Sequence, residues 1–237
     1  MISTGISCIY NKINKTLDQQ SYFIIQPINI GHGITLGNLF RRILLSEMIG
    51  YGITKLKINN INSEFQKIFY IREDILEIIL NLKEIKFKST ISNLNFTKNT
   101  IIKGNLLQKG PIIITAGMFK LTSKNIKILN PYQYICTLIT NKYLNINLEI
   151  NCGYGYKIAY TNLTSLYNYI DLDTIYTPVK KIMYNVRICY DNYGNIKESL
   201  FLDILTNGTI TPTRCLFESF LYLVNTFYSL FEKQITI

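Results

Sequence analysis

Apolar positions along the chain recur at two different spacings, and together these predict a mixed α+β fold. Steps of three and four residues, which place side chains on one face of a helix, mark three stretches: 33–48, about 72–82, and 211 onward. Short alternating or continuous apolar runs, typical of strands, fill most of the remaining chain. We therefore expect few helices and many short strands.

The first helical stretch runs from Gly33 to Met48 and is strongly amphipathic. We expect Thr35 to cap its start and Gly50 to supply the left-handed residue just past its end. Two adjacent arginines, Arg41 and Arg42, lie on its flank. Its apolar stripe consists of Leu36, Leu39, Phe40, Ile43, Leu44 and Met48. By residue chemistry alone, such a stripe most often packs on the protein's own core.

The second helical stretch, about Arg72 to Leu82, has charges that suit the helix dipole. Glu73 and Asp74 are expected in its first turn, and Lys83 follows its end. Two adjacent acids could also form a catalytic pair. Because no nucleophile or set of metal ligands lies nearby in the sequence, we favour the capping interpretation.

The last helical stretch begins with a clear start signal, Thr211 as the N-cap and Pro212 at the first helical position. It carries two parallel apolar rows, more than one small sheet can cover. One row consists of Leu216, Phe220, Leu223, Phe227 and Leu230, and the other of Phe217, Leu221, Val224, Tyr228 and Phe231. A large exposed apolar surface usually marks a partner site, so we expect the first row to bind another chain.

The strand-like runs also show an order along the chain. Residues 1–20 are expected to be irregular, and a strand follows from Tyr22. Leu56 and Ile58 should point inward on a half-buried strand, and residues 84–160 should form an antiparallel β-rich module. A hairpin is expected from strands 179–190 and 197–206, joined at Asp191–Gly194.

The order of elements predicts an insertion. The first helix ends near Gly50, and the hairpin and last helix begin near Tyr176, so the two chain ends can form one discontinuous domain. We expect this domain to comprise residues 1–51 and 176–237, with two main helices on an antiparallel sheet. Residues 52–175 would then form an inserted β-rich domain.

Composition excludes several classes of protein. Of the 237 residues, 48% are hydrophobic, enough for a packed core, and no apolar run is long enough to predict a membrane-spanning helix. The five cysteines are dispersed and His32 is the only histidine, so we expect no metal site, redox pair or cofactor. We also expect no catalytic residues.

A formal net charge of +10 and eighteen tyrosines raise the possibility of a free-standing basic RNA-binding protein of an organelle. However, no run of five or more positive residues occurs. Residues with A/T-rich codons, namely Ile, Asn, Lys and Tyr, are abundant throughout. We therefore interpret the basicity mostly as codon bias, which is typical of organelle and endosymbiont genomes.

One motif resembles a known family closely. Thr35-Leu-Gly-Asn-x-x-Arg-Arg-Ile-Leu-Leu-Ser46 resembles the first-helix signature of the alpha subunit of bacterial-type, multisubunit RNA polymerase. Three later stretches, 72–83, 176–186 and 206–212, resemble that family's later motifs in the same order. The resemblance extends from about Tyr22 to the end and is poorest in roughly 93–151. His32 and Ile34 depart from the family's usual residues around Gly33.

The resemblance implies a non-catalytic assembly subunit of a DNA-directed RNA polymerase. Two copies would pair through a dimerisation domain built from the chain ends, and the homodimer would seat the beta and beta-prime type large subunits. The implied dimer interface consists of Leu36, Leu39, Phe40, Ile43, Leu216, Phe220, Leu223, Phe227 and Leu230. The implied docking residues for the large subunits are Arg41, Arg42, Lys83, Pro178 and Val179, with Arg42 matching an arginine that supports docking of one of them.

Other readings of the resemblance concern pairing, extent and location. A heterodimeric archaeal or eukaryotic alpha-like subunit is an alternative, but the four motifs favour the homodimeric bacterial type.

The sequence stops at Ile237, so we expect no separate C-terminal DNA-binding domain and no specific DNA contact. No membrane association is expected. The codon bias and the absence of an import-peptide pattern point to a plastid, with the cytoplasm of an A/T-rich bacterium as the alternative.

Overall fold

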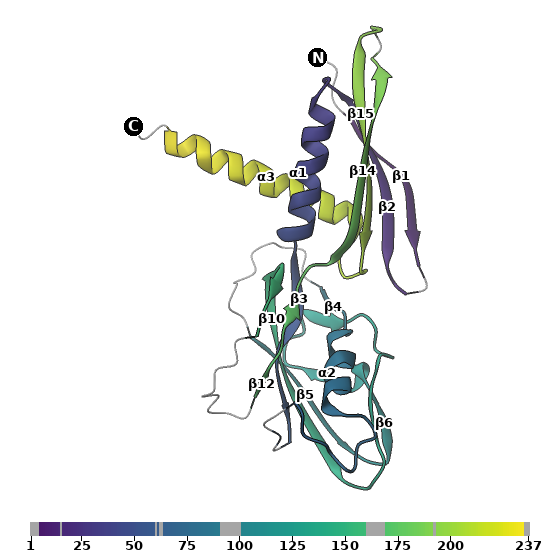
Figure 1. Cartoon of the computed structure of the whole chain (residues 1–237), viewed down its shortest axis with the longest axis vertical. Coiled ribbons are helices and arrows are strands. Elements are labelled where there is room, and N and C mark those ends of the chain that lie inside the picture. Colours follow the sequence, from purple (N-terminus) through teal and green to yellow (C-terminus); the bar gives the residue numbers. More distant parts are fainter. Residues whose placement is uncertain are drawn as a thin grey trace. The chain divides into compact units, whose positions relative to one another are not determined.

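A computed structural model of the chain describes residues 5–14, 16–59, 61, 64–90, 101–159, 169–191 and 193–234 (Figure 1). The chain divides into two compact units, residues 1–48 with 177–237, and residues 49–176. These breaks lie within a few residues of the breaks expected from the sequence, after residues 51 and 175. Helices and antiparallel strands occur in both units, which confirms the α+β class.

The chain-end unit contains one four-stranded antiparallel sheet, with strand order β1-β2-β15-β14. Its strands are β1 (Gly5–Ile13), β2 (Gln19–Ile28), β14 (Val179–Tyr190) and β15 (Ile196–Thr206). The hairpin of β14 and β15 confirms the sequence prediction, and Gly194 in its turn has a φ of 79°.

The strand β1 corrects the expectation that residues 1–20 are irregular, although residues 1–4 and 15 lie outside the described part of the chain. Every residue of β1 is exposed, and its apolar residues Cys8, Ile9 and Tyr10 are consecutive, so the sequence does not show the alternation that marks a half-buried strand. Backbone pairing with β2 holds it in place at the sheet edge.

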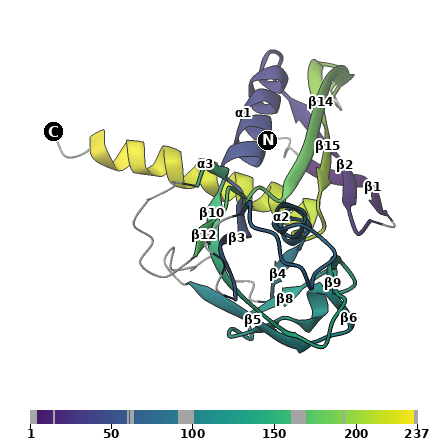
Figure 2. The ribbon, with the colours of Figure 1, turned by 60° about the horizontal axis from the view of Figure 1, so that its bottom comes forward.

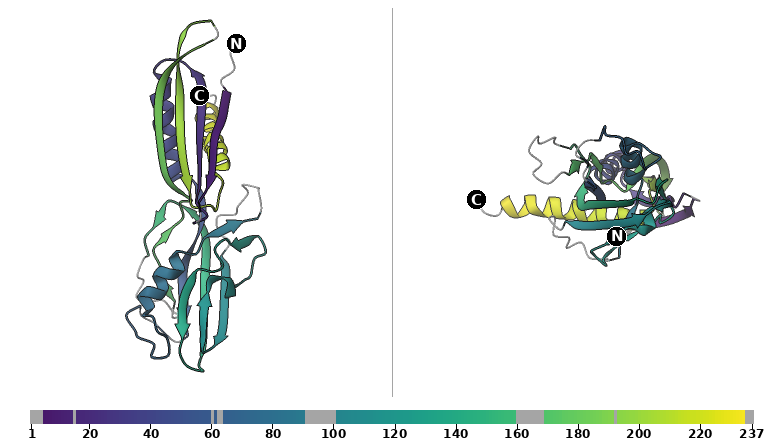
Figure 3. Two further views of the ribbon diagram at one scale, coloured as in Figure 1. Left: turned by 90° about the vertical axis from the view of Figure 1, so that its right-hand side faces the viewer. Right: turned by 90° about the horizontal axis from the view of Figure 1, so that it is seen from below.

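Two helices, α1 (His32–Ser46) and α3 (Pro212–Gln234), cover one face of this sheet. In the left view of Figure 3 both helices lie behind the sheet, and Figure 2 shows α3 continuing past the strands. The core between helices and sheet is apolar and includes Phe23, Ile25, Phe40, Ile43, Leu44, Leu200, Leu202, Ile204, Cys215 and Leu216. Thr211 precedes α3 and Pro212 opens it, as predicted, and the Thr211 carbonyl accepts the Cys215 N–H at 2.9 Å.

Both predicted ends of α1 are wrong. The helix begins at His32, so Thr35 lies inside it and donates its hydroxyl hydrogen to the Gly31 carbonyl instead of capping the start. The helix ends at Ser46, and Gly50 lies within the strand β3 (Ile49–Ile58) without a positive φ. A Cβ on Gly50 would collide with the Tyr176 carbonyl oxygen, so close backbone approach accounts for this glycine.

The inserted unit is built on a five-stranded antiparallel sheet with order β12-β3-β10-β5-β7. Its other members are β12 (Ile170–Asp171), β10 (Tyr143–Tyr154), β5 (Ile102–Lys109) and β7 (Lys120–Leu121). Shorter elements complete the unit: α2 (Ile75–Lys83), β4 (Phe87–Ser89), β6 (Ile112–Thr115), η1 (Ala116–Met118), β8 (Ile126–Ile128), β9 (Tyr134–Leu138), β11 (Tyr156–Lys157) and β13 (Thr174–Ile175).

The core of the inserted unit fills the space between one face of this sheet and α2. Leu56 and Ile58 are fully buried there, as their alternation predicts. They belong to the same apolar cluster as Ile78 and Leu82 of α2. The β-rich character of residues 84–160 is also confirmed, although 91–100 and 160 lie outside the described residues.

The helix α2 starts later than predicted. It begins at Ile75, and Asp74 occupies the N-cap position without a capping hydrogen bond from its side chain. Glu73 therefore precedes the helix, whereas Lys83 lies at its end as expected. Of the helices that the structure describes, none has the length and apolarity needed to cross a membrane.

Candidate interaction surfaces

The first turn of α1 is capped by a residue far away in the sequence. The Glu198 carboxylate on β15 accepts the backbone N–H groups of Gly31 and Gly33, at 2.9 and 2.8 Å. These hydrogen bonds, together with the nearby His32, hold the pKa of Glu198 below its ordinary value despite partial desolvation. Sequence reasoning missed this cap, because a helix start gives no signal of an acceptor 165 residues away.

Two glycines let α1 lie close to β14 and β15. A Cβ on Gly37 would lie 2.5 Å from the Cδ2 atom of Tyr184, and a Cβ on Gly33 would lie 2.8 Å from Val186. The Tyr184 hydroxyl donates a hydrogen bond to Asn38 at 2.6 Å. The Gly-Asn pair of the first-helix motif thus has a packing role, because it receives the ring and the hydroxyl of one tyrosine.

The structure revises the predicted dimer interface. Phe40, Ile43 and Leu216 are 1%, 5% and 4% exposed and belong to the core of their own copy. Phe40 packs edge-on against Phe220, with ring centroids 4.8 Å apart. Because these three side chains are already buried within one chain, we remove them from the predicted interface. Four further residues are half-buried against the same core: Leu36, Leu39, Phe220 and Leu223.

The second half of α3 is not covered by any other part of the chain that the structure describes. Phe227 and Leu230 are 61% and 59% exposed, and the neighbouring row is equally open at Val224, Tyr228 and Phe231. A helix of 23 residues is about 35 Å long, and only its first half packs on the sheet. Figures 1 and 2 show the remainder extending beyond the strands. These side chains line a shallow apolar hollow along the helix.

A second hollow in the chain-end unit lies where β1, β2, α1 and α3 meet. Its apolar wall is formed by Ile6, Ile25, Pro27, Ile28, Leu36, Phe40 and Phe220. Its polar lining consists of Asn29, His32 and Lys197, and the Lys197 ammonium donates a hydrogen bond to Asn29 at 2.8 Å. The chain-end unit therefore presents both a protruding apolar helix and an apolar hollow.

The predicted docking residues for large subunits fall into two groups. Arg41, Arg42 and Lys83 are exposed, the first two on α1 and the third at the end of α2. Pro178 and Val179 are buried, and the Pro178 carbonyl accepts the Asn207 N–H at 2.9 Å. The prediction that these two side chains offer a docking surface is therefore corrected. They anchor the start of β14.

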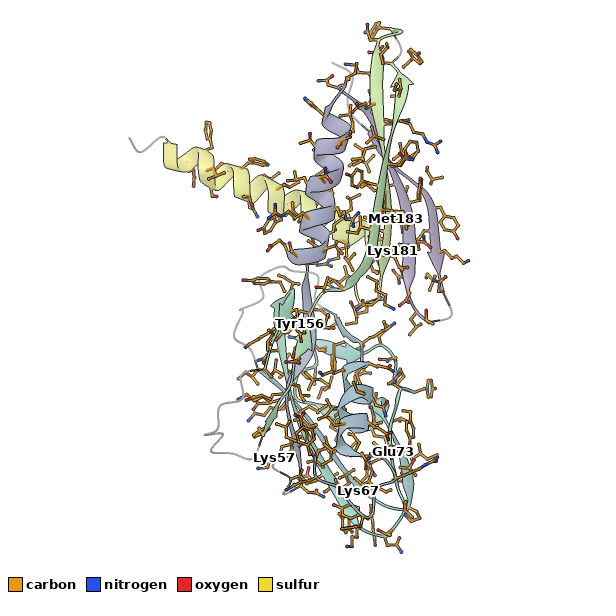
Figure 4. All side chains as sticks on the ribbon, in the orientation of Figure 1. Lys57, Lys67, Glu73, Tyr156, Lys181 and Met183 are labelled. Carbon is orange, nitrogen blue, oxygen red and sulfur yellow. The ribbon has the colours of Figure 1, made fainter. Side chains whose placement is uncertain are left out.

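Glu73 accepts two hydrogen bonds from β9 within the inserted unit. Its carboxylate, labelled in Figure 4, accepts the Thr137 N–H at 2.7 Å and the Tyr134 hydroxyl. These hydrogen bonds tie the start of α2 to β9. Burial and the hydrogen bond to Glu73 raise the pKa of Tyr134. The adjacent Asp74 instead faces Lys67 at 3.5 Å. The two acids therefore do not act as a pair.

The reactive groups of the chain are dispersed. All five cysteines are free thiols, and burial raises the pKa of both Cys136 and Cys215 to about 12. Such thiols remain protonated at neutral pH and are poor nucleophiles. Over the described ranges, no group of three or more His, Cys, Asp and Glu side chains is arranged to hold a metal ion.

Comparison with known proteins identifies the class of the inserted unit and then the family of the whole chain. Residues 56–177 match the family model of the RNA polymerase Rpb3/RpoA insert domain. The DNA-directed RNA polymerase subunit alpha of Trieres chinensis is 39% identical over 231 residues, covering 97% of this chain and 72% of that protein.

Alpha subunits of Thalassiosira pseudonana and Pyropia yezoensis are 38% and 37% identical, each over 97% of this chain and 71% and 72% of those proteins. The chain therefore belongs to the family of DNA-directed RNA polymerase alpha subunits. This confirms the resemblance seen in its motifs and makes the chain a subunit of the transcription enzyme.

Proposed function

We propose that the chain is the non-catalytic assembly subunit of its polymerase, and that it pairs with a second copy to seat the beta and beta-prime type large subunits. The observation that carries this proposal is the exposed apolar second half of α3. A row that includes Phe227 and Leu230, each about three-fifths exposed, is left uncovered by the described residues of its own chain and needs a partner surface.

A second copy suits this surface because the same unit also carries an apolar hollow. The protruding half of α3 from one copy can pack against the hollow lined by Ile6, Leu36 and Phe220 of the other. The reciprocal contact then forms by symmetry, which gives a closed pair. Each fully buried apolar side chain contributes about 1.5–3 kcal/mol. In a symmetric pair each interface residue is buried once in each copy, so its contribution is doubled. The doubled gain offsets the cost of association, which is roughly 4–15 kcal/mol.

The proposed docking of large subunits rests on the exposed cations. Arg41 and Arg42 lie on the exposed side of α1, and Lys83 ends α2. An arginine guanidinium makes paired hydrogen bonds to a carboxylate, which suits a fixed contact between large chains. The revised dimer surface comprises Leu36, Leu39, Phe220, Leu223, Phe227 and Leu230.

We also propose that the protein works in a plastid. The relatives reported above come from algae, and the A/T-rich codon pattern of the sequence agrees with an organelle genome. The cytoplasm of an A/T-rich bacterium is the alternative. Sequencing DNA from purified plastids and from any associated bacteria shows which of the two genomes carries the gene.

Sedimentation of the purified full-length chain tests the pairing. We expect a dimer for the unchanged chain and monomers for the double variant Phe227→Asp with Leu230→Asp. The matched control is Asn225→Asp with Ser229→Asp, which adds the same charge to the polar side of the same helix half and should leave the dimer intact. A dimer of unchanged mass in the first variant, with the circular dichroism of the folded chain, contradicts the proposed interface.

A further inference from the structure

One face of the five-stranded sheet in the inserted unit is rich in lysine and asparagine. Alternate residues of β3, β10 and β5 point into the apolar core, and the residues between them lie on the opposite face. The side chains on this face are all exposed or half-exposed. Its polar members are Lys55, Lys57, Asn59, Lys103, Asn105, Lys109, Lys120, Asn145, Asn147, Glu149 and Asp171.

Strand pairing aligns these side chains in rows. Lys57 pairs with Asn147, Asn147 with Asn105, and Asn105 with Lys120, across four neighbouring strands. Neighbouring strands lie about 4.8 Å apart, so this row spans about 14 Å. In the next row Lys55 and Lys103 flank Glu149. Folding thus gathers lysines that the sequence spreads over more than sixty positions.

The positive charge of this face is mostly uncompensated. Lys55 pairs with Asp171 at 3.8 Å. Within the part of the chain that the structure describes, Lys57, Lys103, Lys109 and Lys120 form no ion pair. The face therefore carries five lysines against two acids. In the view of Figure 4, Lys57 lies at the side of the unit away from Glu73.

We propose that this face binds the sugar–phosphate backbone of duplex DNA without reading its sequence. Lysine and asparagine side chains are typical donors to phosphate oxygens. A row of side chains about 14 Å across is wider than the major groove, about 12 Å, so we expect this face to meet the backbone rather than the base edges. The aromatic rings at its edges, Tyr143 and Tyr169, already lie under Lys109 and Lys57, with ammonium-to-centroid distances of 5.6 and 5.5 Å. A lysine over each ring leaves only its other face for an unstacked base, so we expect contacts to phosphates to dominate, which favours a duplex over a single strand.

We choose DNA among possible polyanions because the enzyme to which this subunit belongs is directed by a DNA template. Such a contact differs from promoter recognition, since it depends on phosphates alone. It also does not depend on pairing of two copies, because every residue involved belongs to one inserted unit.

The test measures binding of the purified full-length chain to a fluorescent mixed-sequence duplex of about 30 base pairs over a series of salt concentrations. Each neutralised phosphate contributes about 0.9 to the slope of log affinity against log salt. We therefore expect the triple variant Lys57→Gln, Lys103→Gln, Lys120→Gln to reduce this slope by about 2.7, with an affinity loss of about tenfold or more at low salt.

The matched control removes three exposed lysines elsewhere in the same unit, as Lys88→Gln, Lys124→Gln, Lys127→Gln. Lys88 and Lys127 face each other on the separate β4–β8 pair. An affinity loss below about twofold is expected for this control. Equal losses in the two triple variants, or no binding by the unchanged chain, overturn the proposal. Tighter binding of single-stranded RNA or of a polyglutamate peptide, with the same dependence on the three lysines, also overturns it by showing a different partner.

Discussion

Glu198 on β15 accepts the backbone N–H of Gly33 at 2.8 Å, so a strand residue closes the first turn of a helix that lies far from it in the sequence. The same carboxylate accepts the Gly31 N–H. Each free N–H of a helix start needs an acceptor, and an anion is favoured there by the helix dipole. The sheet and α1 are thereby joined at a fixed position.

Replacing this carboxylate makes the chain-end unit less stable and changes its acid sensitivity. The folded pKa of Glu198 lies below its unfolded value, so its contribution to stability is present above the unfolded pKa and is lost as pH falls through the folded pKa. We expect Glu198→Gln to unfold at lower urea concentration than the unchanged chain at pH 7, and this difference to shrink below about pH 4. Urea unfolding at pH 7, 5 and 3 measures both effects.

The difference between the two proteins isolates Glu198, because other carboxylates with lowered pKa values, such as Asp173 and Asp191, titrate in both. A gap between the two unfolding midpoints that stays constant from pH 7 to pH 3 would show that the charge of Glu198 is not involved.

Gly37 is required by the ring of Tyr184. Overpacking costs about 1–3 kcal/mol, and replacing a helical glycine by alanine returns about 1 kcal/mol, so we expect Gly37→Ala to lower the free energy of unfolding by about 1 kcal/mol. In a Tyr184→Ala background the collision is removed, and the same change should become stabilising. A double-mutant cycle from urea unfolding checks this reversal of sign. If the two substitutions instead change the free energy of unfolding additively, the ring of Tyr184 is not the reason for the glycine at position 37.

Glu73 should matter more for stability than its partner Tyr134. Glu73→Ala leaves the Thr137 N–H without its side-chain acceptor, and such a loss costs about 1–3 kcal/mol. Tyr134→Phe removes one hydroxyl from the same carboxylate and should cost about 0.5–1.5 kcal/mol. Unfolding of both variants followed by circular dichroism tests the order. The reverse order would mean that the hydroxyl is the main support of Glu73.

Arg42 provides the test of docking. We expect Arg42→Ala to reduce recovery of the large subunits at least severalfold when the tagged chain is pulled from reconstituted polymerase, while the dimer persists in sedimentation. Arg187→Ala is the control, because Arg187 is an exposed arginine of the same unit that lies over Phe201, on β14 rather than α1. Loss of the dimer itself in Arg42→Ala would assign Arg42 to pairing instead.

Periodicity predicted those parts of the fold that depend on neighbouring residues. The stripe of α1 up to Leu44, the start of α3 and the inward Leu56 and Ile58 are as expected, because local spacing decides which side chains share a face, whereas Met48 lies past the end of the helix. The strand β1 was missed since its residues are exposed on both sides. The lysine face was missed because strand register, which the sequence does not show, brings Lys57 and Lys120 into one row.

The candidate interface shows the same limit more sharply. Spacing places Leu216 and Phe227 in one row of α3 but does not say what covers each of them. The helix continues past the strands, so the sheet buries Leu216 and leaves Phe227 exposed (Figure 2). Only the position of the sheet under the helix, set by residues elsewhere in the chain, divides this row between the core and the surface.

The uncovered end of α3 also has a consequence for how the protein is made. Before it pairs, a newly synthesised chain exposes this apolar helix surface, and exposed apolar surface favours aggregation with other unfolded chains. Overproduction of this chain, beyond the amount that its partners can bind, should therefore give insoluble aggregates rather than free soluble subunit.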